Sequence, residues 1–584
     1  MAGMNWERLV PGRSFIAAAM AAFVALVVAA PASAGDPILQ PASYPDMTTY
    51  SCRTDAIDIH PGQNINDFAT TKTCPHAEVV SGPGSADVFN AGSSAQGYVT
   101  RFKPSMVEIK PGGKLVTPSV WDLHLHHVVW ALNGNPTFAS GEEKTEVKMP
   151  QGYGQKVAAD QNWFINLMLH NLGQSDNRQV YLTWEIDWVP ETNPARTDIR
   201  GTNVRWLDVA GSPQVYPVFD AEKGYDTNGD DKFVFPDEAQ NPSDPAYAEE
   251  AGKISAARSW TVSNPSGSTL VFGAGHLHPG GENVALMVAR DGADAGSAAG
   301  NDPSEVKNLF QSDAKYYEPA GAVSWDVAME ATRADWRISL EQGDRVFINV
   351  TYDVKRASWY ESMGILPLAV AGGNDDPLAK DPFDDAADVQ AMYDEGGILT
   401  HGRLKENIDT KARKDLKLPN PRKLKSGPAV PSGGVDIRSF NYLTGGFTAI
   451  GGFPTSLMKP PTIESGETVS FDNLDALPTQ TNEEQAWHSI TSCRAPCNKG
   501  SGIGYPLANG PIKFDSGQLG YGKGFSSEVT SGDSFYETPP LTYNPNRRDV
   551  IKTKAGAKKK LKATTYTYFC RIHPLMRGSI RVVK

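Results

Sequence analysis

Short apolar runs that end at Gly, Pro, Asn or Asp occur throughout this chain, and they limit the folds it can adopt. Clear cases are Val180–Val189, Thr269–Phe272, Val284–Val288 and Arg345–Tyr352. Runs of this length with these flanking residues are typical of β-strands. Helical periodicity is scarce, apart from a short helix expected near Asp384–Tyr393. We therefore predict an all-β fold.

The length and the composition indicate several folded domains in an acidic chain. With 584 residues, the chain is long enough for about three or four domains. Hydrophobic residues make up 40% and charged residues 21%, which excludes wholesale disorder. The net charge of −12 argues against nucleic acid as a partner. The segment Gly372–Gly434 is rich in Asp, Lys and Pro, so we expect an ordered-to-flexible linker there.

The beginning of the chain has the pattern of an export signal. Arg8 and Arg13 precede the apolar run Phe15–Ala30, and Pro31–Ala34 has the small residues of a cleavage site. This pattern predicts a signal peptide over residues 1–34. An uncleaved anchor is the alternative, although the run is short for a membrane span. We expect a secreted, periplasmic or cell-surface protein with no membrane span after cleavage, in a compartment where disulfides persist.

The chain has five cysteines, and an odd number needs a reason in an exported protein. Cys52 lies near Cys74 in the sequence and Cys493 lies near Cys497, so each pair can form a local disulfide bond. Free thiols are the alternative for Cys493 and Cys497. Cys570 has no neighbouring cysteine.

The strongest chemical signal is the segment Tyr568–Gly578, which contains Cys570, His573 and Met576. A further histidine, His488, lies upstream. Two imidazoles, a thiolate and a weak axial thioether are the ligand set of a mononuclear blue-copper site. The thiolate suits Cu(I), the imidazoles suit Cu(II), and no position is open for a substrate. We therefore expect one-electron transfer.

This motif, with the strand pattern at Ile463–Asn473, resembles the cupredoxins, and its short Cys-x-x-His-Pro-x-Met loop is most similar to amicyanin. The resemblance covers about Val435–Lys584 and implies a Greek-key β-sandwich with a type 1 copper for electron transport. The ligands that it implies are His488, Cys570, His573 and Met576. Phe569 and Arg571 stand where a multicopper oxidase would have histidines, which argues against that family.

Most of the other histidines gather in three segments, which are Trp121–Trp130, Phe164–Asn171 and Gly273–Gly281. Side chains two residues apart point to the same face of a strand, so His276 and His278 can bind one ion together. A third ligand would then come from another strand. The alternative is a set of unrelated histidines in the core or at the surface.

The order of these segments resembles the copper type II, ascorbate-dependent monooxygenases, the group of peptidylglycine hydroxylating monooxygenase and dopamine β-monooxygenase. The resemblance covers roughly Tyr98–Val370, including a downstream pattern of Gly343-Asp344, Tyr352 and Glu361-Ser362-Met363. It implies two antiparallel β-sandwich domains with one type 2 copper each. The first copper would bind His126, His127 and His170, and the second, catalytic copper would bind His276, His278 and Met363.

Strand alternation and the resemblance differ about His124. Alternation places His124 on one face with His126, whereas the family uses His126 with His127, so we expect His124 to lie beside the ligands. Met363 has the alternative role of a buried core methionine. Ala274 replaces the Arg with which the peptide-processing members hold a carboxylate, which argues against a peptide substrate.

One further segment has the spacing of a calcium loop. Asp226, Asn228 and Asp230 stand at positions 1, 3 and 5, and acids follow near position 12. Asp231 replaces the usual Gly at position 6. A turn without metal is the alternative.

The expected domains are the signal peptide (1–34), two copper monooxygenase-like sandwiches (35–205 and 206–370), a linker (371–434) and a cupredoxin domain (435–584). We expect the cupredoxin to pass electrons from a redox partner protein or a small reductant to a dicopper unit. That unit would use O₂ on a small organic substrate. The basic run Lys552–Lys562 is a docking site for an acidic redox partner or a solvated hairpin. The alternative function is a pure electron carrier, or a copper-holding protein, with the sandwiches as a non-catalytic scaffold.

Overall fold

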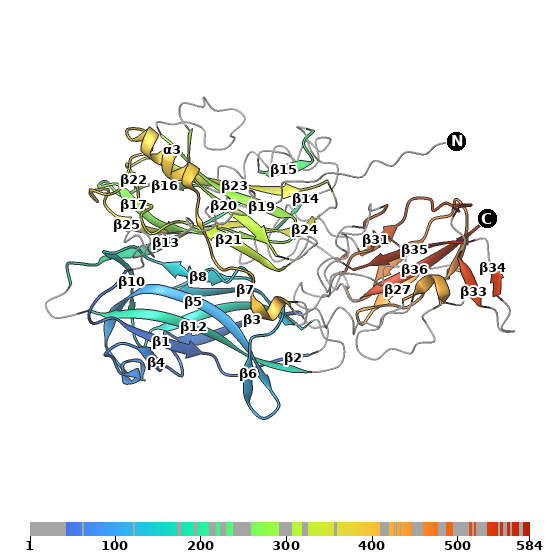
Figure 1. Cartoon of the computed structure of the whole chain (residues 1–584), viewed down its shortest axis with the longest axis horizontal. Coiled ribbons are helices and arrows are strands. Elements are labelled where there is room, and N and C mark those ends of the chain that lie inside the picture. The colour runs from blue at the N-terminus through green and yellow to red at the C-terminus, as the bar shows by residue number, and fades with distance from the viewer. Residues whose placement is uncertain are drawn as a thin grey trace, which may run out of the picture. The chain divides into compact units, whose positions relative to one another are not determined.

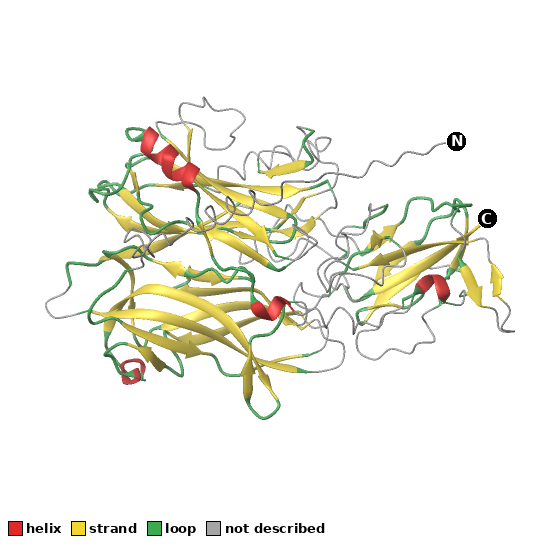
Figure 2. Ribbon diagram, in the orientation of Figure 1, coloured by secondary structure: helices red, strands yellow, loops and turns green. Residues whose placement is uncertain are grey.

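Strands form nearly all of the regular structure, which confirms the all-β prediction (Figure 2). The computed structural model describes residues 42–60, 64–90, 92–120, 123–171, 177–191, 196–209, 218–221, 229–236, 259–290, 306–317, 325–355, 359–408, 420–424, 427, 429–431, 434–446, 459–476, 486, 488–494, 513–516, 519–520, 534–546, 549–552, 558–560, 563–570 and 576–584. The expected signal peptide lies outside these residues. Within them, no helix combines the length and the apolar character needed to cross a membrane.

The first β-sandwich packs a four-stranded sheet against part of a 13-stranded sheet (Figure 1). The four-stranded sheet has the order β3 (Asn64–Lys72), β11 (Asn162–Asn171), β7 (Leu123–Leu132) and β8 (Asn135–Ser140). The facing strands are β10 (Tyr153–Ala158), β5 (Gln96–Lys110), β12 (Arg178–Pro190), β1 (Thr48–Arg53) and β4 (Glu78–Ser81). The short strands β2 (Ile57–Ile59), β6 (Lys114–Val116) and β9 (Val147–Lys148) extend the larger sheet. Alternate side chains of both sheets, such as Leu125, Leu167, Phe102 and Trp184, fill the core between them.

The second β-sandwich uses the other end of the 13-stranded sheet. Its strands there are β13 (Arg200–Asp208), β25 (Gly364–Gly372), β17 (Ser268–Gly273), β22 (Ile338–Leu340) and β18 (His276–Leu277). They face a seven-stranded sheet of β15 (Lys232–Phe235), β23 (Arg345–Asp353), β19 (Gly281–Ala289), β20 (Val306–Tyr316), β21 (Val327–Ala331), β26 (Ile398–Leu399) and β16 (Trp260–Thr261). A small sheet pairs β14 (Phe219–Ala221) with β24 (Trp359–Ser362). Buried side chains such as Leu270, Leu286, Ile348 and Leu368 form the core.

The two sandwiches share the 13-stranded sheet, so backbone hydrogen bonds join them. β10 pairs with β13 in parallel, with Gly154 opposite Gly201. β13 continues across the domain boundary that we placed at residue 205/206. A side-chain hydrogen bond also links the two sandwiches. The Tyr153 hydroxyl on β10 donates it to Asp376 (2.5 Å), which follows the end of β25.

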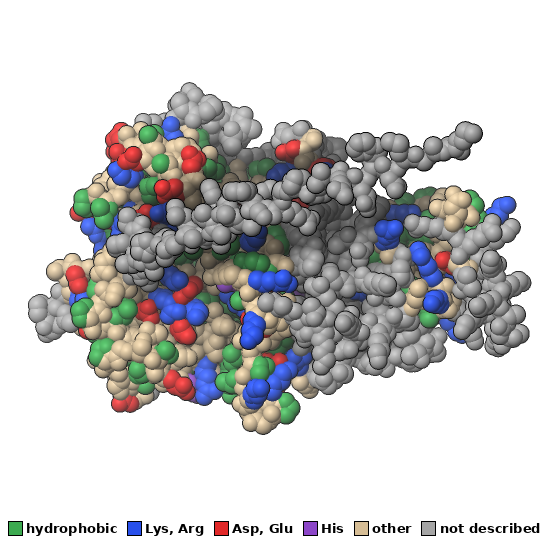
Figure 3. All heavy atoms as spheres, viewed as in Figure 1, with side chains coloured by type: hydrophobic (Ala, Val, Ile, Leu, Met, Phe, Trp, Pro, Cys, Tyr) green, Lys and Arg blue, Asp and Glu red, His purple; other side chains and the backbone are tan. Residues whose placement is uncertain are grey.

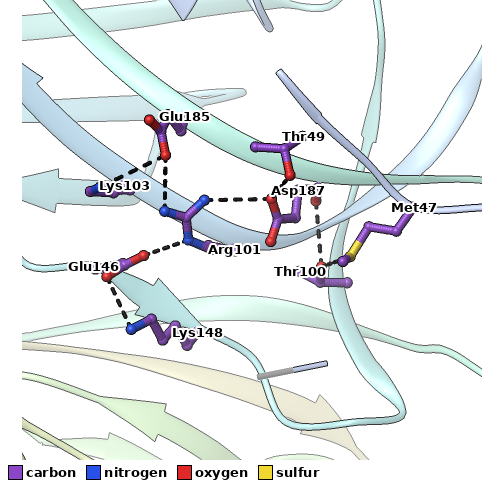
Figure 4. A network of polar contacts seen from close by, with 9 residues as sticks. All are labelled: Met47, Thr49, Thr100, Arg101, Lys103, Glu146, Lys148, Glu185 and Asp187. Atoms are coloured by element: carbon purple, nitrogen blue, oxygen red, sulfur yellow. Dashed lines mark hydrogen bonds and ion pairs between the residues drawn. The ribbon is translucent and has the colours of Figure 1, made fainter. Parts of the chain in front are cut away.

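Charged side chains tie the strands of the first sandwich together around Arg101 on β5 (Figure 4). The guanidinium binds Glu146, Glu185 (2.9 Å) and Asp187 (3.5 Å). Thr49 on β1 donates a further hydrogen bond to Asp187 (2.7 Å). Because these groups come from β1, β5, β12 and the segment before β9, the network holds three strands and that segment together.

The first part of the predicted linker packs against the second sandwich. The expected short helix is confirmed as α3 (Ala386–Glu395), and its Val389 is buried in the core of that sandwich. Arg290 pairs with Asp381 ahead of the helix (2.7 Å). Two 3₁₀ turns follow, Lys405–Ile408 and Pro421–Lys423. The composition of residues 371–408 suggested a linker, but these residues pack against the second sandwich. They do so because acidic side chains such as Asp381 find partners outside the segment, which composition does not reveal.

The C-terminal module, residues 435–584, contains two four-stranded sheets. One has the order β28 (Asn441–Tyr442), β27 (Val435–Arg438), β30 (Ser470–Asn473) and β32 (Phe535–Glu537). The other has the order β29 (Thr462–Glu464), β36 (Arg577–Val583), β35 (Ala563–Phe569) and β31 (Thr491–Cys493). Each sheet contains one parallel pair, and side chains such as Ile437, Phe471, Tyr568 and Ile580 form a common core. The basic run overlaps a hairpin of β33 (Val550–Lys552) and β34 (Lys558–Lys560).

Of the described cysteines, all but Cys570 are disulfide-bonded. Cys52 and Cys74 form the predicted disulfide bond. Cys493 is also disulfide-bonded, whereas Cys497, its predicted partner, lies outside the described residues. Cys570 is buried and takes no part in a disulfide. The Cys52–Cys74 bond is typical of a protein in an oxidising compartment.

Candidate functional site

A bulge in β7 determines which face its histidines occupy. The register of β7 against β11 shifts between Leu125 and His127, so His126 is the extra residue. Such a bulge re-aims the side chains around it. Leu125 and Val128 are both buried in the core of the first sandwich. His126 and His127 therefore share the opposite face of the sheet, which is the face that meets the second sandwich.

Three histidines of the first sandwich gather on this face. His124 lies opposite His170 on β11, and their ring centroids are 4.5 Å apart. The His126 ring lies 4.8 Å from His170 and 6.1 Å from His124. Strand alternation thus brings together His124 and His126, as the spacing in the sequence suggested. All three side chains are buried.

A tryptophan of the second sandwich packs against this group. The Trp325 ring is stacked on His124 at 5.1 Å and lies 4.5 Å from His126. Asn407 holds the two segments together, since it accepts a hydrogen bond from the Val120 backbone N–H (3.0 Å) and donates one to Asp326 (2.9 Å). A residue of the predicted linker therefore positions both the start of β7 and the Trp325 segment.

The His-x-His pair of the second sandwich turns its two rings toward different neighbours. The rings of His276 and His278 are 5.3 Å apart and nearly perpendicular, at 88°. The His278 ring lies 4.6 Å from His126 and 5.2 Å from Trp325. His276 instead pairs through Nδ1 with Glu143 Oε1 (3.1 Å), which comes from the first sandwich.

One buried hydroxyl links this pair to the predicted methionine ligand. Tyr352 Oη accepts hydrogen bonds from the backbone N–H groups of His278 (3.2 Å) and Met363 (3.0 Å), and it donates one to the Met363 carbonyl (2.7 Å). Tyr352 is fully buried, and burial raises its pKa, so it stays protonated. Tyr352 and Met363, which belong to one pattern in the sequence, are thus hydrogen-bonded to each other in the structure.

A pocket lies between the sandwiches beside these groups. Its open volume is about 480 Å³, and it is lined by His127, His276, Glu143 and Met363 together with apolar side chains. Met363 is buried and packs against Met168 of β11. On the coloured parts of the face drawn in Figure 3, acidic and basic side chains are interspersed with apolar and other groups.

Burial keeps these imidazoles neutral. It lowers the pKa of His124 to about 3, and burial together with His276 lowers the pKa of His127 to about 3. The pKa of His126 falls well below its usual value, first through burial and then through His278 and His170. Burial would raise the pKa of Glu143, but His276 more than offsets it, so the pKa of this carboxyl is lowered. Neutral imidazole is the form that binds metals.

The donor types at this interface fit copper, although the donor atoms do not converge on one point. Imidazole and thioether groups are accepted copper ligands. The Nδ1 of His126 and the Nε2 of His276 are buried and have no hydrogen-bond partner among the described residues. Over the same residues, no three His, Cys, Asp or Glu side chains have the arrangement of a metal site.

The structure groups the predicted ligands differently from the two expected sets. His126 and His170 lie together as expected, but His124 joins them and His127 faces the pocket with His276 and Met363. His278 lies against His126. Sequence reasoning missed two members, Glu143 and Trp325. Glu143 lies in the polar segment after β8 and Trp325 precedes β21, and no spacing connects either residue to the histidines.

In the C-terminal module, three of the four predicted copper ligands are described, and all three are buried. The Sγ of Cys570 lies 3.9 Å from Nδ1 of His488. The Cys570 backbone N–H donates to the Met576 carbonyl (3.0 Å), which closes the loop between them. The Ser489 backbone N–H donates to the Cys570 sulfur (3.3 Å). His573 lies outside the described residues.

A carboxylate holds the other side of the His488 ring. Asp475 Oδ2 lies 3.0 Å from Nε2 of His488. Burial lowers the pKa of His488, but Asp475 and Cys570 outweigh it and raise that pKa to about 9. Asp475 also accepts the backbone N–H groups of Ser439 (2.6 Å) and Phe440 (2.9 Å), so its position is fixed. A partner that orients one ring nitrogen is typical of a metal-binding histidine.

The predicted calcium loop is only partly described. Asp226 and Asn228 lie outside the described residues. Asp230 accepts a hydrogen bond from the Lys232 backbone N–H (3.0 Å), and Asp231 pairs with Lys355. Both contacts are typical of a polar turn.

Comparisons with known proteins give only distant matches. No family model matches the chain, and no curated protein does. A copper-containing nitrite reductase from Thermus scotoductus is similar at 13% identity, over 54% of this chain and 55% of that one, with a TM-score of 0.14. The chain thus spans about half the length of that structure. The VP2 subviral particle of infectious bursal disease virus is similar at 12% identity, over 59% and 78% of the two chains, with a TM-score of 0.17. TM-scores this low do not indicate a shared fold or function.

Proposed function

We propose that the chain is an exported copper redox protein with an electron-transferring C-terminal module and an O₂-dependent, monooxygenase-like unit formed by the two sandwiches. The observation that carries the proposal is the meeting of five buried histidines, the partly buried His276 and the buried Met363 at one interface. Burying so many imidazoles costs free energy unless hydrogen bonds or a metal ion satisfy their ring nitrogens. The sequence resemblance to copper monooxygenases supports the same assignment.

The donors divide into two groups. We assign His124, His126 and His170 to one copper ion, because their rings are mutual neighbours. We assign His276, Met363 and His127 to the other, because they border the pocket. His278, whose ring lies 4.6 Å from His126, connects the two groups. When bound, copper would supply one-electron redox chemistry and O₂ activation.

The residues around the donors have clear structural tasks. Glu143 accepts from Nδ1 of His276, which leaves Nε2 as the metal-binding nitrogen. Tyr352 fixes the backbone of His278 and of Met363 through one hydroxyl. Neutral, buried imidazoles hold no competing proton at physiological pH.

The overall reaction needs a source of electrons. One C–H bond of the substrate becomes C–O–H, the O–O bond of O₂ breaks, and two electrons and two protons reduce the second oxygen atom to water. The C-terminal module would supply the electrons one at a time from an external one-electron reductant, a small molecule or a partner protein. The tether would raise the effective concentration of this carrier.

Metal analysis of the full chain, with optical and EPR spectra, tests the proposal. We expect about three copper ions per chain, one blue and two of type 2. Cys570→Ser should remove only the blue copper, and His276→Ala should lower only the type 2 signal. A protein that holds a single blue copper, unchanged by His276→Ala, would contradict the enzymatic part.

One observation favours a second function, a pure electron carrier with a non-catalytic scaffold. The described residues contain no ready three-ligand metal site, whereas the C-terminal module has Cys570 beside His488. Under this alternative, His276→Ala would leave electron transfer, copper content and O₂ consumption unchanged.

A further inference from the structure

The pocket beside His276 and Met363 has a lining that disfavours anionic ligands. Its apolar side chains come from both sandwiches and include Val129, Ala139, Trp206, Ala274, Ile365 and Pro367. Among the described residues around the pocket, none is Lys or Arg. A carboxylate or phosphate would therefore enter without a cationic partner, and burying an unpaired charge is costly.

The acidic group of the pocket already has partners. Glu143 Oε1 accepts the Gly141 backbone N–H (2.7 Å) and pairs with His276 Nδ1 (3.1 Å), and the side chain is only 3% exposed. An ammonium group would have to compete with His276 for this carboxylate. The remaining polar side chains, Ser140 and Thr145, are neutral and suit one hydroxyl or carbonyl group of a ligand.

The character of the lining suits a small molecule. Ligand sites are mostly apolar with a few polar groups, and this lining has the same composition. We propose that this pocket binds a neutral, mostly apolar small molecule with at most one hydrogen-bonding group, and places it against His276 and Met363. Binding depends on the pocket alone, while a role for this molecule as the substrate rests on the proposed function.

Binding by the copper-free full chain tests the pocket without any turnover. Four probes share one ring and differ in charge: toluene, benzyl alcohol, benzoate and benzylamine. Titration calorimetry should show toluene and benzyl alcohol bound at least about tenfold more tightly than benzoate or benzylamine. Tighter binding of either charged probe would overturn the proposal.

Filling the pocket provides the matched variants. Ala139 and Val129 are half-buried at its edge, so Ala139→Trp and Val129→Trp should each weaken benzyl alcohol binding at least about tenfold. Ala139→Ser should change it little. If both Trp variants fold, as judged by unchanged circular dichroism and unchanged hydrogen exchange in β7 and β25, and still bind benzyl alcohol normally, the site lies elsewhere.

The outcomes also separate this inference from the proposed function. Selective binding of the neutral probes by a protein that loads only one blue copper would support the pocket and contradict the monooxygenase. A protein with three copper ions that binds none of the neutral probes would contradict the pocket alone.

Discussion

The two candidate copper regions differ in how their ligands come together. In the C-terminal module, Cys570 and Met576 lie on one short loop, and only His488 comes from a distant segment. At the interface of the sandwiches, the donors come from β7, β11, β18 and the residue between β24 and β25, on two sandwiches that share one sheet. A site built on one loop is encoded locally, whereas a site built between sandwiches depends on the register and packing of both.

The largest effect is expected from removal of the thiolate in the local site. Cys570→Ser should abolish the blue absorption and one-electron transfer, because a hydroxyl is a poor ligand for Cu(I). Optical spectra and reduction kinetics measure this loss. The type 2 EPR signal should persist, and its disappearance would show that the two regions depend on each other.

Removal of the Tyr352 hydroxyl tests the interface. Tyr352→Phe leaves two backbone N–H groups and one carbonyl without their buried partner. Each unsatisfied group costs about 1–3 kcal/mol, so urea unfolding of the sandwiches should shift strongly and copper should be lost there. The blue band should be unchanged; Tyr44→Phe, which removes a hydroxyl that accepts the Gly152 backbone N–H (2.9 Å), is the control for a lost hydroxyl outside the cluster.

The pH dependence of the interface should be set in part by Glu142. Burial raises the pKa of Glu142 to about 7, and its carboxylate accepts the Leu125 backbone N–H (2.6 Å). Since the folded pKa lies above the ordinary value of 4.5, stability should fall as pH rises from about 4.5 to 7. Glu142→Gln should flatten this slope and stabilise the sandwich at pH 7 by about 1–3 kcal/mol. Hydrogen exchange of β7 at several pH values measures it, and an unchanged slope would exclude Glu142 as the source.

A slope of the same sign, but at higher pH, is expected in the copper-free C-terminal module. The pKa of His488 is raised to about 9 despite burial, by Asp475 and Cys570. The folded pKa exceeds the unfolded value of ~6.5, so this stabilisation is complete below pH 6.5 and lost as pH rises through 9. Asp475→Asn should remove about 1–2 kcal/mol of it. Exchange in β35 and β36 at pH 6 and 9.5 measures the change, which should vanish in the variant.

Particular elements show how far the sequence predicts the fold. Val180–Val189, Thr269–Phe272, Val284–Val288 and Arg345–Tyr352 each fall inside a strand, in β12, β17, β19 and β23. Their apolar runs and flanking turn residues act locally, so they can be read without a structure. The sharing of one sheet by two sandwiches could not be predicted, because the pairing of β10 with β13 is a long-range contact.

The candidate site divides in the same way. Residue types and spacing determined the donor inventory of both regions, along with the loop that holds Cys570 and Met576. Only the tertiary structure decided that His124 joins His126 and His170, that His127 turns to the pocket, and that Glu143 and Trp325 lie among them. The physical reason is the bulge at His126 and the packing of two sandwiches, which depend on contacts between residues far apart in the chain.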